Sequence, residues 1–258
     1  MLNSKLKAKI IALAIVLPIP VSVHALDWIA HRGNACSSPE NSLQAIEDSW
    51  RLGADGVEID VRFSADGVAY LFHDKAFRGK KMLDLEYSQI VSLIGERLAP
   101  ELDSALAIPA SGYYLLDLKE TRVDDIPILQ KSLSDSNIRY EQVIIQSSDV
   151  KILSELQKRI GHVRLAYLSK LKRVGIANVI PNPMDIINPI KHLDIKILSI
   201  KGRRFLNAEY LKALKSAGQE VFVWTINRKE RAAFYRQIGI NGVITDNLAA
   251  FVGDRAEC

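Results

Sequence analysis

The chain has 258 residues, of which 48% are hydrophobic and 25% charged, with 14 Gly and 9 Pro. This composition is typical of a globular protein and excludes a disordered tail, a collagen-like repeat and a disulfide-dense mini-scaffold. The formal charge of +4 arises mostly at the start of the chain, because residues 26–258 carry 31 basic and 30 acidic side chains. A nearly neutral body excludes a nucleic-acid partner, which would require an excess of Lys and Arg.

Residues 1–25 have the three parts of a secretory signal peptide. Lys5, Lys7 and Lys9 form the positive start, and an apolar run broken by two prolines and a serine leads to the small-residue cleavage site at 23–25. An uncleaved membrane anchor is the alternative, but a membrane-spanning helix needs about 18 apolar residues and the apolar run in residues 1–25 is shorter. We therefore expect a periplasmic or secreted protein that begins near Leu26 and has no stable membrane insertion, since no later segment could span a bilayer.

Two cysteines, Cys36 and Cys258, remain in the mature chain. Export permits a disulfide, and two cysteines allow one pairing. We favour a bond between them, with two free thiols or a metal-ligand role as the alternatives.

Short β-rich runs alternate with helical patterns along the mature chain. The expected strands are 26–31, 56–63, 67–73, 112–119, 142–147, 163–169, 196–201, 220–226 and 242–246. The expected helices are 42–52, 148–160, 207–217 and 228–238, each followed by a glycine that can end it. This alternation predicts parallel strands joined by right-handed crossovers.

One connection is too short for such a crossover. Only three residues separate Phe63 from Gly67, whereas a parallel crossover takes about a dozen. The run 67–73 must therefore return antiparallel, as a hairpin. The other eight runs predict an α/β fold, a single TIM (β/α)8 barrel over 26–258 with an extra hairpin strand after the second barrel strand. A doubly wound open sheet ranks second, because no Gly-rich phosphate loop follows any strand.

Two expected strands carry acids where a buried strand is normally apolar. In one, Glu58 and Asp60 share a face about 7 Å apart, and in the other Asp117 and Lys119 share a face. Buried carboxylates must be paired or must bind a cation, and three oxygen ligands suit Mg²⁺ or Ca²⁺ better than zinc. The alternative is a metal-free salt-bridge cluster of Glu58, Asp60, Arg62 and Lys119.

Two histidines end β segments at the same edge of the predicted barrel. His31 follows the first strand and His73 ends the hairpin strand, and both side chains can titrate near neutral pH. Together they could take and give a proton in acid/base catalysis, although a single histidine is usually structural. Arg32, beside His31, offers a planar donor fork for a phosphate.

Short motifs follow one another along the mature chain. They are His31-Arg32-Gly33, Pro39-Glu40-Asn41, Glu58-Ile59-Asp60-Val61, Asp66-Gly67, His73-Asp74, Leu116-Asp117-Leu118-Lys119, Trp224-Thr225-Ile226-Asn227 and Gly242-Val243-Ile244-Thr245-Asp246. Their order and spacing resemble those of the glycerophosphodiester phosphodiesterases over about residues 28–247, which is nearly the whole mature chain.

The resemblance implies a TIM barrel that uses a divalent metal to hydrolyse small-molecule glycerophosphodiesters to sn-glycerol 3-phosphate and an alcohol. It implies that Glu58, Asp60 and Asp117 hold the metal, that His31 and His73 are the acid/base pair, and that Arg32, Lys119 and Trp224 contact the substrate. Two alternatives remain open. One is a related barrel phosphodiesterase that acts on lysophospholipid or sphingolipid head groups, and the other is a catalytically silent barrel that binds phosphodiesters.

The chain departs from the family pattern at three places, one of which is the segment from His73 to Asp117, which is shorter than in many members. The family usually has Glu where this chain has Asp117, which is one methylene shorter, and residues 75–81 (Lys-Ala-Phe-Arg-Gly-Lys-Lys) replace a stretch that often begins Arg-Thr-Thr. The basic segment either favours anionic head groups or is a solvated loop. Glu40 is interpreted mainly as part of a helix start, and Asn227 and Asp246 are assigned no role.

Overall fold

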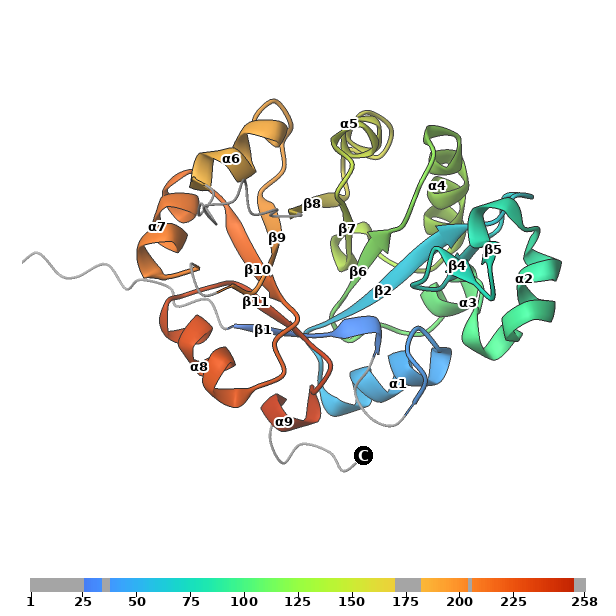
Figure 1. The fold of residues 1–258 in the computed structure, drawn as a ribbon, viewed down its shortest axis with the longest axis horizontal. Helices are drawn as coiled ribbons and strands as arrows, with labels where there is room; N and C mark the ends of the chain where they lie inside the picture. Colours follow the sequence, from blue (N-terminus) through green and yellow to red (C-terminus); the bar gives the residue numbers. More distant parts are fainter. Residues whose placement is uncertain (1–25, 34–37, 170–181, 204–205, 253–258) are drawn as a thin grey trace, which may run out of the picture.

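The structure is a computed structural model that describes residues 26–33, 38–169, 182–203 and 206–252. Eight parallel strands form a closed barrel surrounded by helices (Figure 1). The ring closes because β1 (Asp27–Ala30) pairs with both β11 (Gly242–Thr245) and β2 (Gly56–Phe63). The predicted TIM barrel is confirmed. The expected signal peptide, Cys36 and Cys258 lie outside the described residues.

Each barrel strand lies within one of the expected runs. The remaining strands are β6 (Tyr113–Leu118), β7 (Val143–Ser147), β8 (Arg164–Ser169), β9 (Ile197–Lys201) and β10 (Glu220–Trp224). Alternate side chains fill two separate cores, because successive residues of a strand point to opposite faces. On β2, Val57, Ile59 and Val61 pack against the helices, while Leu115 of β6 and Ile144 of β7 belong to the smaller core inside the barrel.

The extra strand β3 (Ala69–Leu71) pairs antiparallel with the end of β2. β1 pairs only with Gly56 and Val57 at the start of β2, so the far end of β2 has an edge that β3 covers. The connecting turn passes through Gly67 at φ 85°, a conformation that glycine adopts without the steric cost of a side chain. The predicted hairpin is confirmed.

The four predicted helices are present as α1 (Leu43–Leu52), α5 (Val150–Arg159), α7 (Ala208–Ser216) and α8 (Lys229–Gln237). Side chains of Ser42, Asp149 and Asn207 accept backbone N–H groups at the first turns of α1, α5 and α7. The sequence pattern does not predict α2 (Tyr87–Ile94), α3 (Leu102–Leu106), α4 (Ile126–Asp135), α6 (Pro183–Ile187) and α9 (Ala249–Val252). Most of these are too short to show a helical period, and packing rather than local propensity stabilises such helices.

Short 3-10 turns occupy His31–Gly33, Met82–Asp84, Glu96–Leu98, Val123–Asp125, Tyr140–Gln142 and Asn188–Ile190. No helix in the described part of the chain combines the length and the hydropathy that crossing a membrane requires.

Residues 72–101 form an excursion from the barrel between β3 and α3. It contains the small hairpin of β4 (Ala76–Phe77) and β5 (Lys80–Lys81) together with α2, which lie on one side of the barrel (Figure 1). A separate apolar cluster that includes Tyr70, Met82 and Ile90 supports this excursion. The basic segment 75–81 is thereby held beside the end of the barrel at which the parallel strands finish.

Candidate active site

Three carboxylates from two neighbouring strands meet at the carboxyl end of the barrel. The register of β2 and β6 places Asp60 opposite Asp117, and Glu58 points the same way as Asp60 because the two are separated by one residue. One oxygen of each carboxylate lies within 4.8 Å of the others, and no more than 3% of any of the three residues is exposed. The structure thus brings together the three acids expected to hold a metal.

Asp60 is fixed by neutral and positive donors. Asn41 Nδ2 donates to Asp60 Oδ2 at 2.8 Å, and the Asp60 amide donates to Asn41 Oδ1 at 2.9 Å. Lys119 Nζ lies 2.8 Å from Asp60 Oδ1 and also hydrogen-bonds Asp117. Burial by itself raises the pKa of Asp60, but the Lys119 charge and the hydrogen bonds outweigh it and the pKa falls below its ordinary value.

Glu58 and Asp117 have less support. The Arg32 amide donates to Glu58 Oε2 at 2.9 Å, yet burial, followed by the charge of Asp60, raises the pKa of Glu58 to about 8. Burial also raises the pKa of Asp117, and its buried Oδ1 has no hydrogen-bond partner among the described residues. A buried carboxylate oxygen without a hydrogen-bond partner, such as Asp117 Oδ1, fits a bound divalent cation.

The salt-bridge alternative is realised only in part. Lys119 contacts Asp60 and Asp117, but Arg62 does not join the cluster, because its Nη1 lies 2.9 Å from Glu120 Oε2. Arg32 Nε approaches Asp60 Oδ2 at 3.4 Å while its Nη1 is bound by Glu40. Lys119 and Arg32 thus pair with Asp60 and Asp117, whereas Glu58 is approached by His31 Nε2 at 4.0 Å.

His31 is held in place by a residue to which the sequence assigns no role. Its Nδ1 lies 2.5 Å from Asp246 Oδ1, and Asn227 Nδ2 donates to Asp246 Oδ2 at 2.8 Å. Burial lowers the pKa of His31, but the bond to Asp246 and the charge of Glu58 outweigh it and the pKa rises. Because Asp246 engages Nδ1, His31 Nε2 is left facing the acids, 4.0 Å from Glu58 Oε2.

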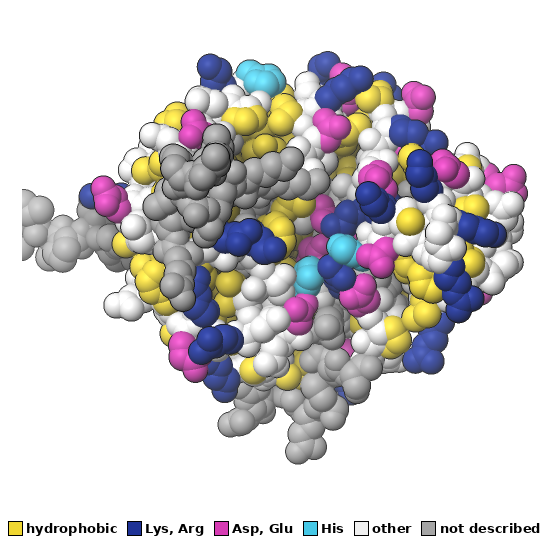
Figure 2. Space-filling view, in the orientation of Figure 1, with side chains coloured by type: hydrophobic (Ala, Val, Ile, Leu, Met, Phe, Trp, Pro, Cys, Tyr) yellow, Lys and Arg dark blue, Asp and Glu magenta, His cyan; other side chains and the backbone are white. Residues whose placement is uncertain are grey.

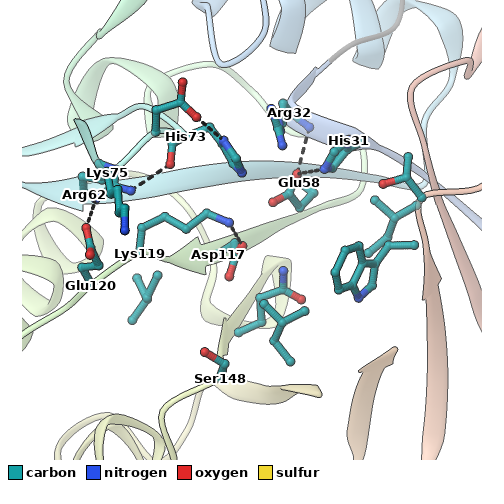
Figure 3. Close-up of a pocket in the computed structure, with 17 residues that line it drawn as sticks. His31, Arg32, Glu58, Arg62, His73, Lys75, Asp117, Lys119, Glu120 and Ser148 are labelled. Carbon is teal, nitrogen blue, oxygen red and sulfur yellow. Dashed lines mark hydrogen bonds and ion pairs between the residues drawn. The ribbon is translucent and has the colours of Figure 1, made fainter. Parts of the chain in front are cut away.

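His73 lies on the loop that follows β3. Its Nδ1 is 2.8 Å from Asp74 Oδ1, and 38% of its side chain is exposed. Arg62 donates from Nε to the Phe72 carbonyl at 3.1 Å and from Nη2 to the His73 carbonyl at 2.8 Å. Figure 3 shows the imidazoles of His31 and His73 directed into one pocket, with Glu58 between them.

A pocket of about 530 Å³ opens over these groups. Every residue expected to act in the site lines it except Asp60, and Trp224, Leu168 and Ile244 supply an apolar wall. Figure 2 shows two histidines in a hollow at the centre of this face, surrounded by acidic and basic side chains. The arrangement can bind an anionic ester, balance its charge and move protons from two sides.

Arg32 does not present a free guanidinium fork. Its Nη1 donates to Glu40 Oε1 at 2.9 Å and to Oε2 at 2.8 Å. Glu40, interpreted mainly as part of a helix start and only secondarily as a site candidate, therefore also orients Arg32 at the site. Asp246 was assigned no role from the sequence. Its position directly after a strand was the signal that could have found it, because the polar residues that follow barrel strands collect at one end of the barrel.

Comparison with known proteins gives one consistent family. The family model described as glycerophosphoryl diester phosphodiesterase matches residues 31–250. A glycerophosphodiester phosphodiesterase of Caldanaerobacter subterraneus is 25% identical over 240 residues, covering 85% of this chain and 93% of the relative. Human glycerophosphodiester phosphodiesterase 1 is 24% identical, covering 85% of this chain and 77% of the relative.

Solved structures with the same fold include two relatives. A putative glycerophosphodiester phosphodiesterase from Galdieria sulphuraria has a TM-score of 0.75 at 18% identity, covering 90% of this chain and 100% of its own. An Oleispira antarctica phosphodiesterase in complex with the product sn-glycerol-3-phosphate has a TM-score of 0.72 at 22% identity, covering 85% and 92% of the two chains. At these identities the structures establish the shared fold.

Proposed function

The chain belongs to the glycerophosphoryl diester phosphodiesterase family and is a phosphodiesterase, and from this premise we propose that it hydrolyses glycerophosphodiesters to sn-glycerol 3-phosphate and an alcohol. One observation carries the proposal: three buried carboxylates form one cluster, and two of them line a single pocket together with two histidines. The product named for the Oleispira structure is consistent with a small-molecule substrate of this kind.

Glu58, Asp60 and Asp117 would hold a divalent cation, Mg²⁺ or Ca²⁺, because all three offer hard oxygen ligands. Such a cation stabilises negative charge that develops on phosphoryl oxygens. Lys119 adds a positive charge at the same place and keeps Asp60 ionised. Arg32, oriented by Glu40, supplies a second positive group on the opposite side of Glu58 (Figure 3).

The two histidines carry the proton transfers. Asp246 holds His31 at Nδ1 and Asp74 holds His73 at Nδ1, which leaves both Nε2 atoms to meet the substrate. One imidazole takes the proton of the glycerol 2-hydroxyl as that oxygen attacks phosphorus, and the other gives a proton to the alcohol oxygen as its P–O bond breaks. Water then opens the resulting cyclic phosphate, with one histidine taking the proton of the water and the other giving a proton to the 2-oxygen, which yields sn-glycerol 3-phosphate. Trp224, on the apolar wall, would contact the carbon skeleton of the glycerol.

The reaction takes place outside the cytoplasm in this proposal, because residues 1–25 have the pattern of a cleaved signal peptide. Amino-terminal sequencing of the exported protein should find a start near Leu26. A mature chain that still begins at Met1 would contradict export with cleavage.

Release of sn-glycerol 3-phosphate from glycerophosphocholine, with and without EDTA, tests the proposal. We expect metal-dependent release, and Asp117→Asn should lower the metal affinity by about tenfold or more, because it removes one charged ligand. Activity restricted to lysophospholipids would favour the head-group alternative, and binding without turnover would favour a silent barrel.

The histidines are tested separately. His31→Ala and His73→Ala should each lower kcat by about 100-fold or more, the range typical of lost acid/base catalysis. Circular dichroism should remain that of the parent. His162→Ala is the matched control, since His162 packs on Tyr140 near the opposite end of the barrel. A near-normal rate for either site variant would remove that histidine from the mechanism.

A further inference from the structure

We propose that Lys75 forms a subsite for negative charge on the alcohol arm of the substrate, so that the enzyme prefers glycerophosphodiesters whose alcohol carries a second phosphate or a carboxylate. The inference rests on the proposed function. The glycerol arm is an uncharged diol in every such substrate, so only the alcohol arm can differ in charge. An unpaired charge in the pocket would therefore discriminate between substrates by the charge of their alcohol arm.

The pairing of the pocket cations leaves Lys75 uncompensated. Arg32 contacts Glu40 and Asp60, Arg62 contacts Glu120, and Lys119 contacts Asp60 and Asp117. Lys75 lines the same pocket, is exposed, and forms no ion pair within the described ranges. A cation that no carboxylate satisfies is the one most able to attract an anionic group of a ligand.

The acids on this side of the pocket are already engaged. Asp74 is hydrogen-bonded to His73, and Glu120 accepts from Arg62 Nη1 at 2.9 Å. Both weaken the positive potential around Lys75 without contacting its ammonium group. Across the pocket, Trp224, Leu168 and Ile244 form an apolar wall. Lys201 Nζ lies 5.5 Å from the centre of the Trp224 ring but does not line the pocket, whereas Lys75 does.

The backbone holds Lys75 at the pocket edge. It lies two residues after His73 at the base of the β4–β5 hairpin, where the Met82 amide donates to the Lys75 carbonyl at 3.0 Å. Figure 3 shows Lys75 beside Arg62, on the opposite side of the pocket from His31. An arm that extends from a phosphorus atom held near Glu58 and Asp117 can therefore run towards this side chain.

The surrounding surface has the same sign. Arg78, Lys80 and Lys81 follow on the β4–β5 hairpin, all exposed, and residues 75–81 contain no acid. Figure 2 shows Lys and Arg side chains on the side of the molecule where Figure 1 places β4 and β5, with acidic side chains nearby. These three residues do not line the pocket, so they would speed the encounter with anionic substrates, while Lys75 would distinguish bound arms.

The test compares kcat/KM for three diesters that share the glycerol phosphate and differ in the arm. Glycerophosphocholine has a cationic arm, glycerophosphoglycerol a neutral arm, and 1,3-bis(glycerophospho)glycerol an anionic arm with two equivalent bonds. After correction for those two bonds, the parent enzyme should prefer the anionic arm. Lys75→Gln should lower that kcat/KM by about threefold to fivefold, the range of exposed ion pairs, and change the other two by less than about twofold.

Charge reversal and rescue sharpen the test. Lys75→Glu should lower kcat/KM for the anionic arm by about tenfold or more, and Lys75→Arg should retain the preference. Lys196→Gln is the matched control, because Lys196 pairs with Asp194 just before β9, at the other end of the barrel. Equal losses on all three substrates, or a parent enzyme that prefers the cationic arm, would overturn the subsite.

A failure of the proposed hydrolase activity can be distinguished from a failure of the Lys75 subsite. If no diester is hydrolysed with metal present, calorimetric binding of 1,3-bis(glycerophospho)glycerol still tests Lys75. Binding that weakens in Lys75→Gln supports the subsite without the activity. Binding that is unchanged contradicts it.

Discussion

Replacing Arg62 by Gln should slow turnover far more than it weakens substrate binding. Arg62 is 4% exposed and joins the end of β2 to the segment that carries His73. Its guanidinium donates to the Phe72 carbonyl at 3.1 Å, to the His73 carbonyl at 2.8 Å and to Glu120 at 2.9 Å. The side chain thus acts on the position of the His73 imidazole rather than on the substrate.

The magnitude follows from these contacts. Each charge-assisted bond to a backbone carbonyl contributes about 1.5 kcal/mol, so the loss of two should lower the free energy of unfolding by about 3 kcal/mol. Glu120 is half exposed and stays hydrated, so its lost partner adds little. Without its anchor the imidazole shifts, and a displacement of about 1 Å is enough to lower kcat by about 100-fold.

Steady-state kinetics at saturating metal and urea unfolding measure the two effects. We expect KM to change by less than about threefold, because the guanidinium is already occupied by protein acceptors, and Arg62→Lys to restore part of kcat. Arg159→Gln, at a partly exposed pair with Glu155 on α5, is the control. A stable Arg62→Gln protein with parental kcat would refute the positioning role, and a change confined to KM would assign Arg62 to substrate binding.

Two further predictions concern the acids. Asn41→Ala should lower the free energy of unfolding by about 3 kcal/mol, measured by urea unfolding, because it leaves the buried Asp60 without two hydrogen bonds; a loss below about 1 kcal/mol would contradict this. Burial and Asp60 raise the pKa of Glu58 from 4.5 to about 8, so in metal-free protein this group's contribution to stability is present below pH 4.5 and is lost as the pH rises through 8. Because Mg²⁺ binds the ionised carboxylate, adding Mg²⁺ should raise the melting temperature of the protein more at pH 8 than at pH 6. Equal increases at the two pH values would argue against Glu58 as a ligand.

Strand alternation made much of the fold and the acid cluster predictable. In 56–63 every second residue is apolar, so the side on which Glu58 and Asp60 lie follows from two-residue periodicity alone. The three-residue gap before Gly67 likewise excludes a crossover on length alone. The β4–β5 hairpin and α2 gave no comparable signal, because they are short and depend on the apolar cluster around Tyr70 and Met82.

Partners that are distant along the chain were not predictable. Asp246 reaches His31 only because the barrel closes between β11 and β1, which joins residues 215 positions apart. The contact of Arg62 with Glu120 spans 58 positions and takes the place of the pairing with Glu58 and Asp60 that the salt-bridge alternative assigned to Arg62. No local pattern encodes either contact.

The sequence by itself determined the barrel, its antiparallel hairpin and the inward direction of Glu58, Asp60 and Asp117, because strand length, spacing and side-chain alternation are local properties of the chain. Only the tertiary structure decided that Asp246 orients His31, that Arg62 anchors the His73 segment and that Lys75 faces the pocket with no carboxylate partner among the residues that the structure describes. These contacts depend on which strands become neighbours and in which register. Register and closure arise from packing the whole barrel.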